Sequence, residues 1–362
     1  MNLKFVLFLN LFSFISFGQT TISNNSEIKS YLDSITNEDF SGTILVAKNN
    51  EIIEKRACGF SNKEFKVENN FDTKFNIASI TKMFTSVAIL QLFQQGKIEL
   101  HQPIGKYLNN YPNKSVRDSV TIHHLLTHTA GTGSFYGEKF SKTDKLRYKE
   151  IIDFVPLFVN DSLLFTPGSK YHYNGSGFVI LGLIIEKVSG QNYYDYLTKN
   201  IFIPAEMNNT AALEIDSIVT NKASGYTQHI KKDKTLIHNY YYLAKASPAA
   251  DYYSTIEDLF RFSKSLRNYT LLNKETTELM FEPKVKGYNT NLGYGIDVDL
   301  RYNQPILGHT GGWYGVRGEL MDFMESGYTI VILSNVDDDG TTGTTKISDY
   351  LKNLIAKNKY KK

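Results

Sequence analysis

The chain has 362 residues, of which 41% are hydrophobic and 21% charged, so it is long enough for a large core and is not typical of a disordered chain, a collagen-like fibre or a coiled coil. Its 40 Lys and Arg residues nearly balance 37 Asp and Glu residues, and the net charge of +3 gives no reason to expect nucleic acid or an anionic membrane as a partner. A single cysteine, Cys58, excludes an intramolecular disulfide framework and a cysteine-based metal cluster.

The N-terminus has the order of a secretory signal peptide. Lys4 precedes an apolar run over 5–17, and small residues follow up to Gly18. The run is too short to span a bilayer. We therefore expect residues 1–18 to be a signal peptide cleaved near Gly18, and the mature protein to be exported (periplasmic or secreted) without stable membrane insertion. The alternatives are an uncleaved anchor and a frayed N-terminus.

The first elements after this segment are predicted to be strands. Residues 41–47 and 51–57 are β-type runs on either side of an Asn49-Asn50 turn, which predicts a hairpin. A helix is predicted to begin near Ser79, because apolar residues then recur at three- and four-residue steps until Gly96 supplies a stop.

The middle of the chain, from about 100 to 283, is rich in helical patterns separated by turns. One helix is predicted over 178–188. The chain returns to strands at 318–323 and 328–335 and closes with a helix over 345–357. The second of these strands is apolar on both faces, as expected of a strand that is covered on both sides.

Strands at both ends with helices between them predict a mixed α/β (α+β) fold, with one sheet assembled from both termini and an inserted, mainly helical lobe. We find no linker that would separate two independent domains, so residues 19–362 are interpreted as one domain. The sheet lobe is predicted at about 27–77 plus 287–357, and the helical lobe at about 78–286. The oligomeric state is left open.

Ser79 and Lys82 form the first candidate site. Residues three apart on a helix share a face, so the Lys82 amine can reach the Ser79 hydroxyl, which needs a nearby base to act as a nucleophile. A helix start also offers free backbone N–H groups for an oxyanion. The same spacing occurs at Ser26 and Lys29, but Ser26 lies just beyond the predicted signal peptide, whereas Ser79 begins a long predicted helix.

Two further segments carry candidate chemistry. A turn-rich loop delivers Tyr173 just ahead of the helix predicted at 178–188, and a phenol beside a Lys ammonium can act as a base because its anion is favoured there. The second segment is 308–312, a glycine-rich stretch that contains His309. Glycines beside a strand allow close approach of another backbone, so a substrate can add there as an extra strand.

The order of these motifs resembles that of the penicillin-recognising serine hydrolases, whose triplets are S-x-x-K, Y-x-N and K-T-G or H-x-G. The likeness is greatest to the class C β-lactamase-related branch, which includes D,D-peptidases, D-aminopeptidases and esterases. It extends over almost the whole mature chain through the stretches 75–82, 120–131, 252–259, 293–295 and 307–312. The resemblance implies a β-lactamase/transpeptidase-like fold, an antiparallel sheet flanked by helices, and no cofactor.

The resemblance also implies roles for individual residues. Ser79 would be the nucleophile and Lys82 its activating neighbour, and Tyr173 a second general base and acid. His309 would stand where the third motif usually places a cation. The expected substrate-binding residues are Thr310, Gly311, Gly312 and Asn174, with the amide of Gly312 pairing with that of Ser79 in an oxyanion hole.

Two positions depart from the family pattern. The Asn of Y-x-N falls on Gly175, which removes the amide that normally contacts the Lys and the substrate; Asn174 and Ser176 are the candidates to replace it. The usual Gly-Gly before the Tyr-Ser-Thr stretch is Ala250-Asp251. The first departure weakens a β-lactamase or D,D-peptidase assignment more than a general ester or peptide hydrolase assignment.

His124 and His128 have the i, i+4 spacing that binds metal on a helix, but no third ligand is evident, so no metal site is expected. Cys58 falls in a predicted strand and is interpreted as a small buried hydrophobe.

The leading hypothesis is a secreted serine hydrolase that acts on amide or ester bonds through an acyl-enzyme on Ser79. Its substrate would be a small molecule or a peptide, cell-wall fragments included. The alternative is a catalytically impaired binding protein for peptidoglycan or peptides on the same fold. The sequence does not choose among β-lactam, D-amino-acid peptide and ester substrates. It also leaves open whether Lys82 or Tyr173 takes the serine proton.

Overall fold

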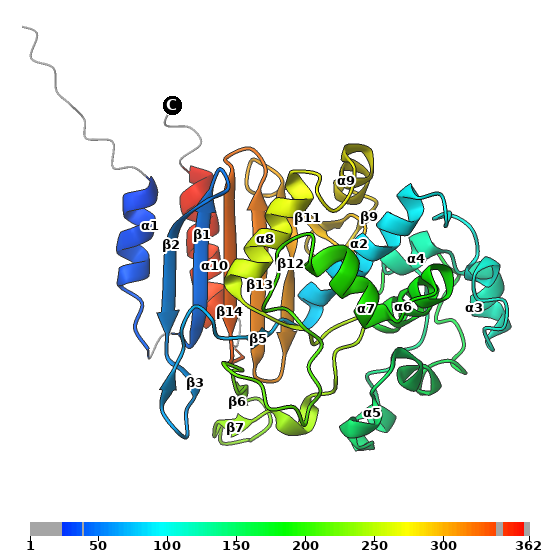
Figure 1. The fold of residues 1–362 in the computed structure, drawn as a ribbon, viewed down its shortest axis with the longest axis horizontal. Helices are drawn as coiled ribbons and strands as arrows, with labels where there is room; N and C mark the ends of the chain where they lie inside the picture. Colours follow the sequence, from blue (N-terminus) through cyan, green and yellow to red (C-terminus); the bar gives the residue numbers. More distant parts are fainter. Residues whose placement is uncertain (1–23, 38–39, 338–342, 358–362) are drawn as a thin grey trace, which may run out of the picture.

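The computed structural model describes residues 24–37, 40–337 and 343–357 (Figure 1). The predicted signal peptide and its cleavage point near Gly18 lie outside these residues. Within the described ranges, no helix combines the length and the apolar character that crossing a membrane would need.

Eight strands of the described chain form one antiparallel sheet, which both ends of the sequence build together (Figure 1). β1 comes from the N-terminal part and pairs along its whole length with β14, from Gly42 opposite Ser334 to Lys48 opposite Tyr328. The sheet predicted to gather both termini is confirmed. In spatial order its strands are β2 (Glu51–Cys58), β1 (Gly42–Lys48), β14 (Tyr328–Ser334), β13 (Val316–Phe323), β12 (Ile306–Trp313), β11 (Asp297–Asp299), β10 (Asn291–Leu292) and β9 (Val285–Lys286).

Helices cover both faces of this sheet. α8 (Ile256–Arg267) packs on one face, while α1 (Asn24–Asp33) and α10 (Gly343–Lys357) pack on the other (Figure 1). β14 lies between them and is buried at every position: Val331 and Leu333 belong to the core on the α8 side, and Ile330 and Ile332 to the core on the α10 side. This confirms the strand that the sequence predicts to be covered on both faces.

The predicted hairpin is present as β1 and β2. Asn49 and Asn50 connect the strands with φ angles of 51° and 68°, the left-handed values that a two-residue hairpin turn requires and that Asn tolerates well. Cys58 ends β2 and is 5% exposed, as expected of a small buried hydrophobe.

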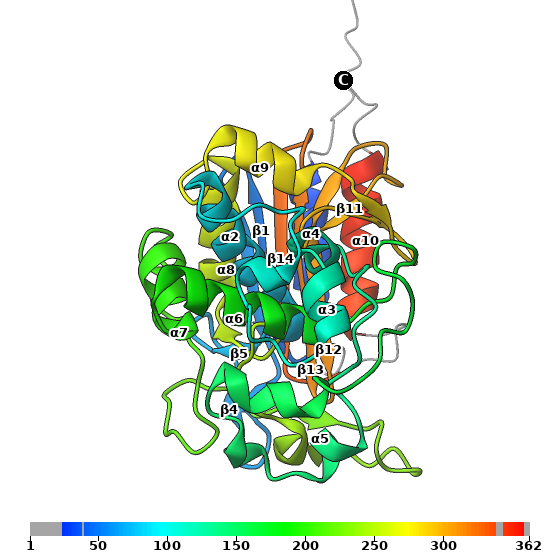
Figure 2. The same cartoon turned by 90° about the vertical axis from the view of Figure 1, so that its right-hand side faces the viewer.

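The segment between β2 and β9 forms a mainly helical lobe, which faces the viewer in Figure 2. Its longest helices are α2 (Thr81–Gln94) and α6 (Ser176–Ser189); Gly190 ends α6 in the left-handed conformation. The other helices are α3 (Lys114–Ser119), α4 (Ile122–Leu126), α5 (Glu138–Lys142), α7 (Tyr193–Leu197) and α9 (Lys274–Phe281), with the short helices η1 (Ala78–Ile80), η2 (Ile104–Lys106), η3 (Lys145–Arg147), η4 (Ile151–Leu157), η5 (Thr198–Phe202) and η6 (Tyr240–Tyr242). The described residues also form three two-stranded sheets: β3 (Phe60–Asn62) with β4 (Val67–Glu68), β5 (Phe75–Asn76) with β8 (Tyr253–Ser254), and β6 (Tyr226–Thr227) with β7 (Ile237–His238).

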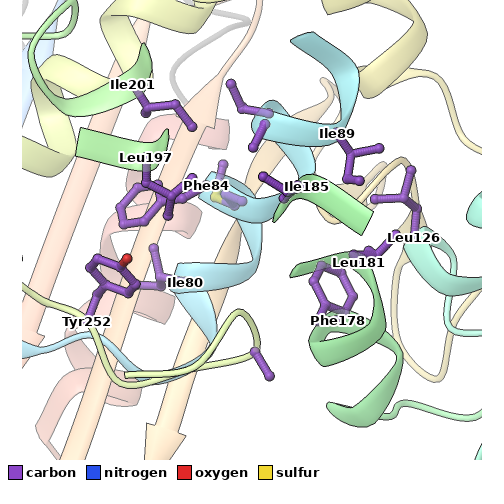
Figure 3. Close-up of a cluster of buried hydrophobic side chains, with 14 of the residues drawn as sticks. Ile80, Phe84, Ile89, Leu126, Phe178, Leu181, Ile185, Leu197, Ile201 and Tyr252 are labelled. Carbon is purple, nitrogen blue, oxygen red and sulfur yellow. The ribbon is translucent and has the colours of Figure 1, made fainter. Parts of the chain in front are cut away.

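α2 is the central element of the lobe and is buried over most of its length. Its Phe84 ring meets the rings of Phe262, Phe202 and Tyr252 at centroid distances of 4.8, 5.2 and 6.0 Å, all edge-to-face. Figure 3 shows Phe84 and Tyr252 within this buried cluster. Each large apolar side chain buried in this way contributes about 1.5–3 kcal/mol to stability. The first turn of α2 is therefore held by a packed core, and this turn carries Lys82.

Candidate active site

A short strand and a tight turn position Ser79. Asn76 is in β5, which pairs with β8, and Ile77 donates its backbone N–H to the carbonyl of Tyr252 at 2.9 Å. The side-chain oxygen of Asn76 accepts a hydrogen bond from the backbone N–H of Ala78 at 2.8 Å, where the chain takes a left-handed φ of 42°. This turn sets Ser79 in η1, directly before α2. The predicted helix start near Ser79 is confirmed.

The Lys82 amine lies next to the Ser79 hydroxyl. Lys82 is 2% exposed; its Nζ is 3.0 Å from Ser79 Oγ and donates to the carbonyl oxygen of Ala249 at 2.6 Å. Burial lowers the pKa of Lys82 to about 7, and the negative charge of Asp251 raises it only in part. A large share of this amine is therefore neutral near pH 7 and can accept a proton.

Tyr173 completes the group around Ser79. Its hydroxyl donates to Ser79 Oγ at 2.8 Å, and 39% of its side chain is exposed. The prediction that a neighbouring ammonium would favour the phenolate is wrong: desolvation of the hydroxyl raises the pKa of Tyr173 instead. The phenol is neutral at pH 7, so it is a proton donor there. Of the two bases left open by the sequence, Lys82 has the better-matched pKa.

The glycine-rich segment 308–312 lies inside β12. A Cβ added at Gly311 would overlap the carbonyl oxygen of Ile77, so only glycine lets this strand approach the turn that holds Ser79. Thr310 and Gly312 are exposed on the neighbouring positions. The substrate-binding stretch predicted from the sequence thus lies beside the predicted nucleophile.

His309 is 7% exposed, and its Nδ1 is 2.5 Å from the carbonyl oxygen of Thr310. Because a carbonyl only accepts, Nδ1 must carry the hydrogen. Burial, the largest cause, lowers the pKa of His309, and the positive charge of Lys82 adds to this, although Asp297 acts in the opposite direction. The imidazole is therefore neutral near pH 7. It occupies the place of the third motif's cation without supplying a charge.

Ser79, Tyr173 and His309 border one cavity of about 590 Å³. Of the described strands, β11 pairs with β12 only from Ile306 to Gly308, so the β12 edge beyond Gly308 faces the cavity without a strand partner from β11. An extended substrate can lie along this edge as an added strand. The residues of the predicted site that line the cavity are Ser79, Tyr173, His309, Thr310 and Gly312.

Asn174 does not point to the substrate, which corrects the sequence expectation. Its side-chain amide donates to the carbonyls of Thr132 and Gly133 at 2.6 and 3.0 Å, and its oxygen accepts from the backbone N–H of Ser176 at 2.6 Å. Ser176 is equally engaged, because its hydroxyl accepts from the backbone N–H of Phe135. Both side chains anchor the loop that delivers Tyr173, and neither replaces the missing amide.

Aromatic rings occupy the space beside Gly175. A Cβ added there would lie 2.9 Å from the ring of Phe135 and 3.4 Å from both Tyr136 and Ala249. The Lys82 amine still has an acceptor, the carbonyl of Ala249. The site therefore keeps its lysine hydrogen-bonded without the amide of the family pattern.

Asp251 belongs to the site although the sequence analysis did not include it among the candidate residues. Its carboxylate accepts from the Asn76 side chain at 3.1 Å, and its φ of 78° is one that glycine adopts far more easily. Burial raises the pKa of Asp251 to about 6, and its charge acts on Lys82. The Ala250-Asp251 departure noted in the sequence was the available signal, because it places a carboxylate at a glycine position.

His124 and His128 are not on one helix, contrary to the spacing argument. α4 ends at Leu126, and His128 follows with a left-handed φ of 56°. The His128 ring packs against Tyr173 at 4.4 Å between centroids, whereas His124 accepts a hydrogen bond at the start of α4. No group of three or more His, Cys, Asp or Glu side chains that could hold a metal ion occurs within the described ranges.

The comparisons with known proteins agree with this geometry. The beta-lactamase family model matches residues 37–351. The chain belongs to the beta-lactamase family. This family is one of serine hydrolases, and the expected β-lactamase/transpeptidase-like fold is confirmed.

Known proteins that are similar to this chain include penicillin-binding proteins. The chain is 28% identical over 316 residues to penicillin-binding protein 4* of Bacillus subtilis (strain 168), covering 83% of this chain and 69% of the relative. The structure of a penicillin-binding protein from Bacillus halodurans superposes with a TM-score of 0.80 at 28% identity, covering 92% of this chain and 99% of that one. The D-amino acid amidase from Ochrobactrum anthropi SV3 shares the fold, with a TM-score of 0.77 at 21% identity over 93% of this chain and 100% of that one.

Proposed function

We propose that this protein hydrolyses esters or amides through an acyl-enzyme on Ser79. The observation that carries the proposal is the placement of Ser79 Oγ 3.0 Å from the Lys82 amine and 2.8 Å from the Tyr173 hydroxyl, at the edge of the β12 cavity. Nucleophilic catalysis requires a hydroxyl within hydrogen-bond reach of a base. The family supports the reaction class.

In this proposal the neutral Lys82 amine takes the proton of Ser79 as Oγ attacks the carbonyl carbon. The backbone N–H groups of Ser79 and Gly312 hold the resulting oxyanion. The Tyr173 hydroxyl protonates the leaving atom, and the Lys82 ammonium returns a proton to Tyr173. Water then attacks the acyl carbon and gives a proton to Lys82. Lys82 passes this proton to Ser79 Oγ as the acyl bond breaks, which releases the acid and restores both the serine and the neutral amine.

Labelling of the catalytic serine tests the proposal. Purified protein is treated with a fluorophosphonate and a fluorescent penicillin, and hydrolysis of neutral aryl esters is measured alongside. We expect the fluorophosphonate on the peptide that contains Ser79, and loss of both labelling and turnover in Ser79→Ala. Turnover that is unchanged in Ser79→Ala would contradict the proposal.

The alternative of an impaired binding protein rests on Gly175, and the same experiment addresses it. Tight, reversible retention of a peptidoglycan fragment by a protein that neither labels nor hydrolyses would favour that function. The hydrogen-bonded Ser79–Lys82 pair supports catalysis instead, because a binding protein has no need for a buried amine next to a hydroxyl.

We further propose that residues 1–18 direct export of the protein. The support is the sequence order of a charge, an apolar run and small residues ending at Gly18. The mass of the protein recovered outside the cytoplasm should match a chain that begins near Gln19. Recovery of full-length protein from the cytoplasm alone would contradict export.

A further inference from the structure

Asp297 is a carboxylate at the cavity that has no cation of its own. It begins β11 and lines the same cavity as Ser79 and Tyr173. Among the described residues, its hydrogen bond comes from the Thr290 hydroxyl at 3.4 Å, and no Lys, Arg or His nitrogen forms an ion pair with it. The negative charge of Asp297 acts to raise the pKa of His309, which also lines the cavity. A carboxylate held in this way remains available to a ligand.

The other charged groups of the cavity are already paired. Asp299 binds the Arg301 guanidinium through both oxygens, at 2.9 and 2.7 Å. Glu319 accepts from Lys352 at 3.2 Å and lies 3.6 Å from Arg317. These pairs involve three cations and two carboxylates, so among the described residues that line the cavity Asp297 is the carboxylate without an ion-pair partner.

The strand register places Asp297 in line with a bound substrate. Asp297 pairs with Gly308, the last β12 residue that β11 covers. A substrate that lies along the open β12 edge, with its carbonyl at Ser79 and Gly312, would extend toward Gly308 and meet the end of β11. Tyr173 lines the same cavity, and the negative charge of Asp297 contributes to its raised pKa, so the phenol that the proposed function has protonate the leaving group lies within the field of Asp297.

We propose that Asp297 selects substrates whose leaving group carries a cation, such as an ammonium group, and disfavours those with a carboxylate at that position. The inference rests on the proposed function and deepens it by naming the charge of the substrate. An opposite charge within about 4 Å at a partly exposed site changes binding by roughly tenfold or more, and a like charge acts in the opposite direction. Substrates with a carboxylate next to the scissile bond would therefore be poor ones.

Three acetyl thioesters of similar size test the inference: S-acetylthiocholine carries a cation, S-(2-hydroxyethyl) thioacetate is neutral, and 3-(acetylthio)propionate carries an anion. In each reaction the C–S bond breaks as Ser79 Oγ forms the acyl bond, the thiol leaves with a proton, and water releases acetate. The free thiol is measured with a chromogenic disulfide. We expect kcat/KM of the wild type to fall from the cationic to the anionic thioester by about 10-fold or more.

The matched variants are Asp297→Asn and Asp118→Asn, which remove the same charge inside the cavity and at an exposed residue of α3. Asp297→Asn should reduce the cation-to-anion ratio by about 10-fold while the neutral thioester changes by less than about threefold, and Asp118→Asn should keep the wild-type ratio. A ratio that survives in Asp297→Asn would overturn the inference. So would a wild-type preference for the anion, which would assign selection to the Arg317 or Lys352 side of the cavity.

A second measurement uses the wild type alone and does not depend on folding of the variant. Choline should slow fluorophosphonate labelling of Ser79 at concentrations where propionate has no effect; equal protection by both, or protection by propionate alone, would overturn the inference. Hydrolysis of none of the three thioesters, together with no labelling, would overturn the proposed function itself. Hydrolysis of all three without charge preference would overturn only the role of Asp297.

Discussion

The spacing Ser-x-x-Lys occurs twice in this chain, in α1 and at the start of α2, and the two regions differ in everything except that spacing. The Lys29 side chain is 58% exposed and pairs with Asp33 at 3.5 Å, as surface lysines do. Lys82 is 2% exposed, lies 3.0 Å from Ser79 Oγ, and has a pKa lowered to about 7 by burial. Burial in a packed helical lobe, rather than the spacing, lowers the pKa of this lysine, and this is why we propose Lys82 as the base.

Removal of the two serine hydroxyls should separate the regions most strongly. We expect Ser79→Ala to lower kcat/KM for a neutral ester by about 10⁴- to 10⁶-fold, because the nucleophile is lost, and Ser26→Ala to leave it unchanged. The rates are measured under identical conditions on variants with matching circular dichroism. A loss below tenfold in Ser79→Ala would mean that another group attacks the substrate.

Removal of the two amines should have the next largest effect. Lys82→Met keeps an unbranched side chain but takes away the proposed base, so kcat should fall by about 10²- to 10⁴-fold. Lys29→Met loses the exposed ion pairs with Asp33 and Glu54 and should change neither kcat nor stability measurably. Steady-state kinetics of both variants checks this. Equal activities for the two would show that burial of Lys82 is irrelevant to catalysis.

Gly175 offers a second test of whether the sequence motif or the surrounding side chains decide how the site works. The family pattern has Asn here, but the ring of Phe135 would lie 2.9 Å from an added Cβ. We expect Gly175→Asn to lower the free energy of unfolding by about 1–3 kcal/mol through overpacking, and Gly175→Ala to lower it less. Urea denaturation measures both. An Asn variant that is as stable as the wild type and more active would show that the Phe135 and Tyr136 rings move aside and that the added amide takes part in catalysis.

Asp251 should have the smallest effect, and one confined to the pH dependence. Its negative charge favours the ammonium form of Lys82, so Asp251→Asn should lower the pKa of Lys82 and move the rise in activity to lower pH. At pH 6 the variant should retain a fraction of its plateau activity that is about two- to tenfold larger than the fraction that the wild type retains. A profile that coincides with the wild type would show that Asp251 only holds Asn76.

Much of the site could be predicted because its residues lie next to recognisable local patterns. Ser79 directly precedes a helix with recurring apolar residues, Tyr173 precedes another helix, and His309 lies in a glycine-rich strand, so motif order alone placed them together. Hydrogen bonds and protonation could not be predicted in the same way. Asn174 binds the carbonyls of Thr132 and Gly133, some 40 positions earlier in the chain, and no linear pattern shows this.

The charges around the site also could not be predicted from the sequence. Asp297 becomes part of the cavity through its register with Gly308, and register depends on how the strands of the folded sheet pair. Desolvation likewise depends on burial in three dimensions, which is why the phenolate expected at Tyr173 was wrong. His128 lies outside the helix that its spacing from His124 suggested, because α4 ends at Leu126 and His128 itself takes a left-handed conformation.

The central claim is that Lys82 loses its proton near neutral pH and thereby activates Ser79. The most direct measurement is the rate at which a fluorophosphonate labels Ser79 in the wild type between pH 5 and pH 10, which reports the nucleophile without a leaving-group step that depends on substrate binding. A group with a pKa of about 7 gives a rate that rises through pH 7 and is level above pH 8. A rate that continues to climb to pH 10, as an ordinary lysine or phenol would produce, would contradict the account.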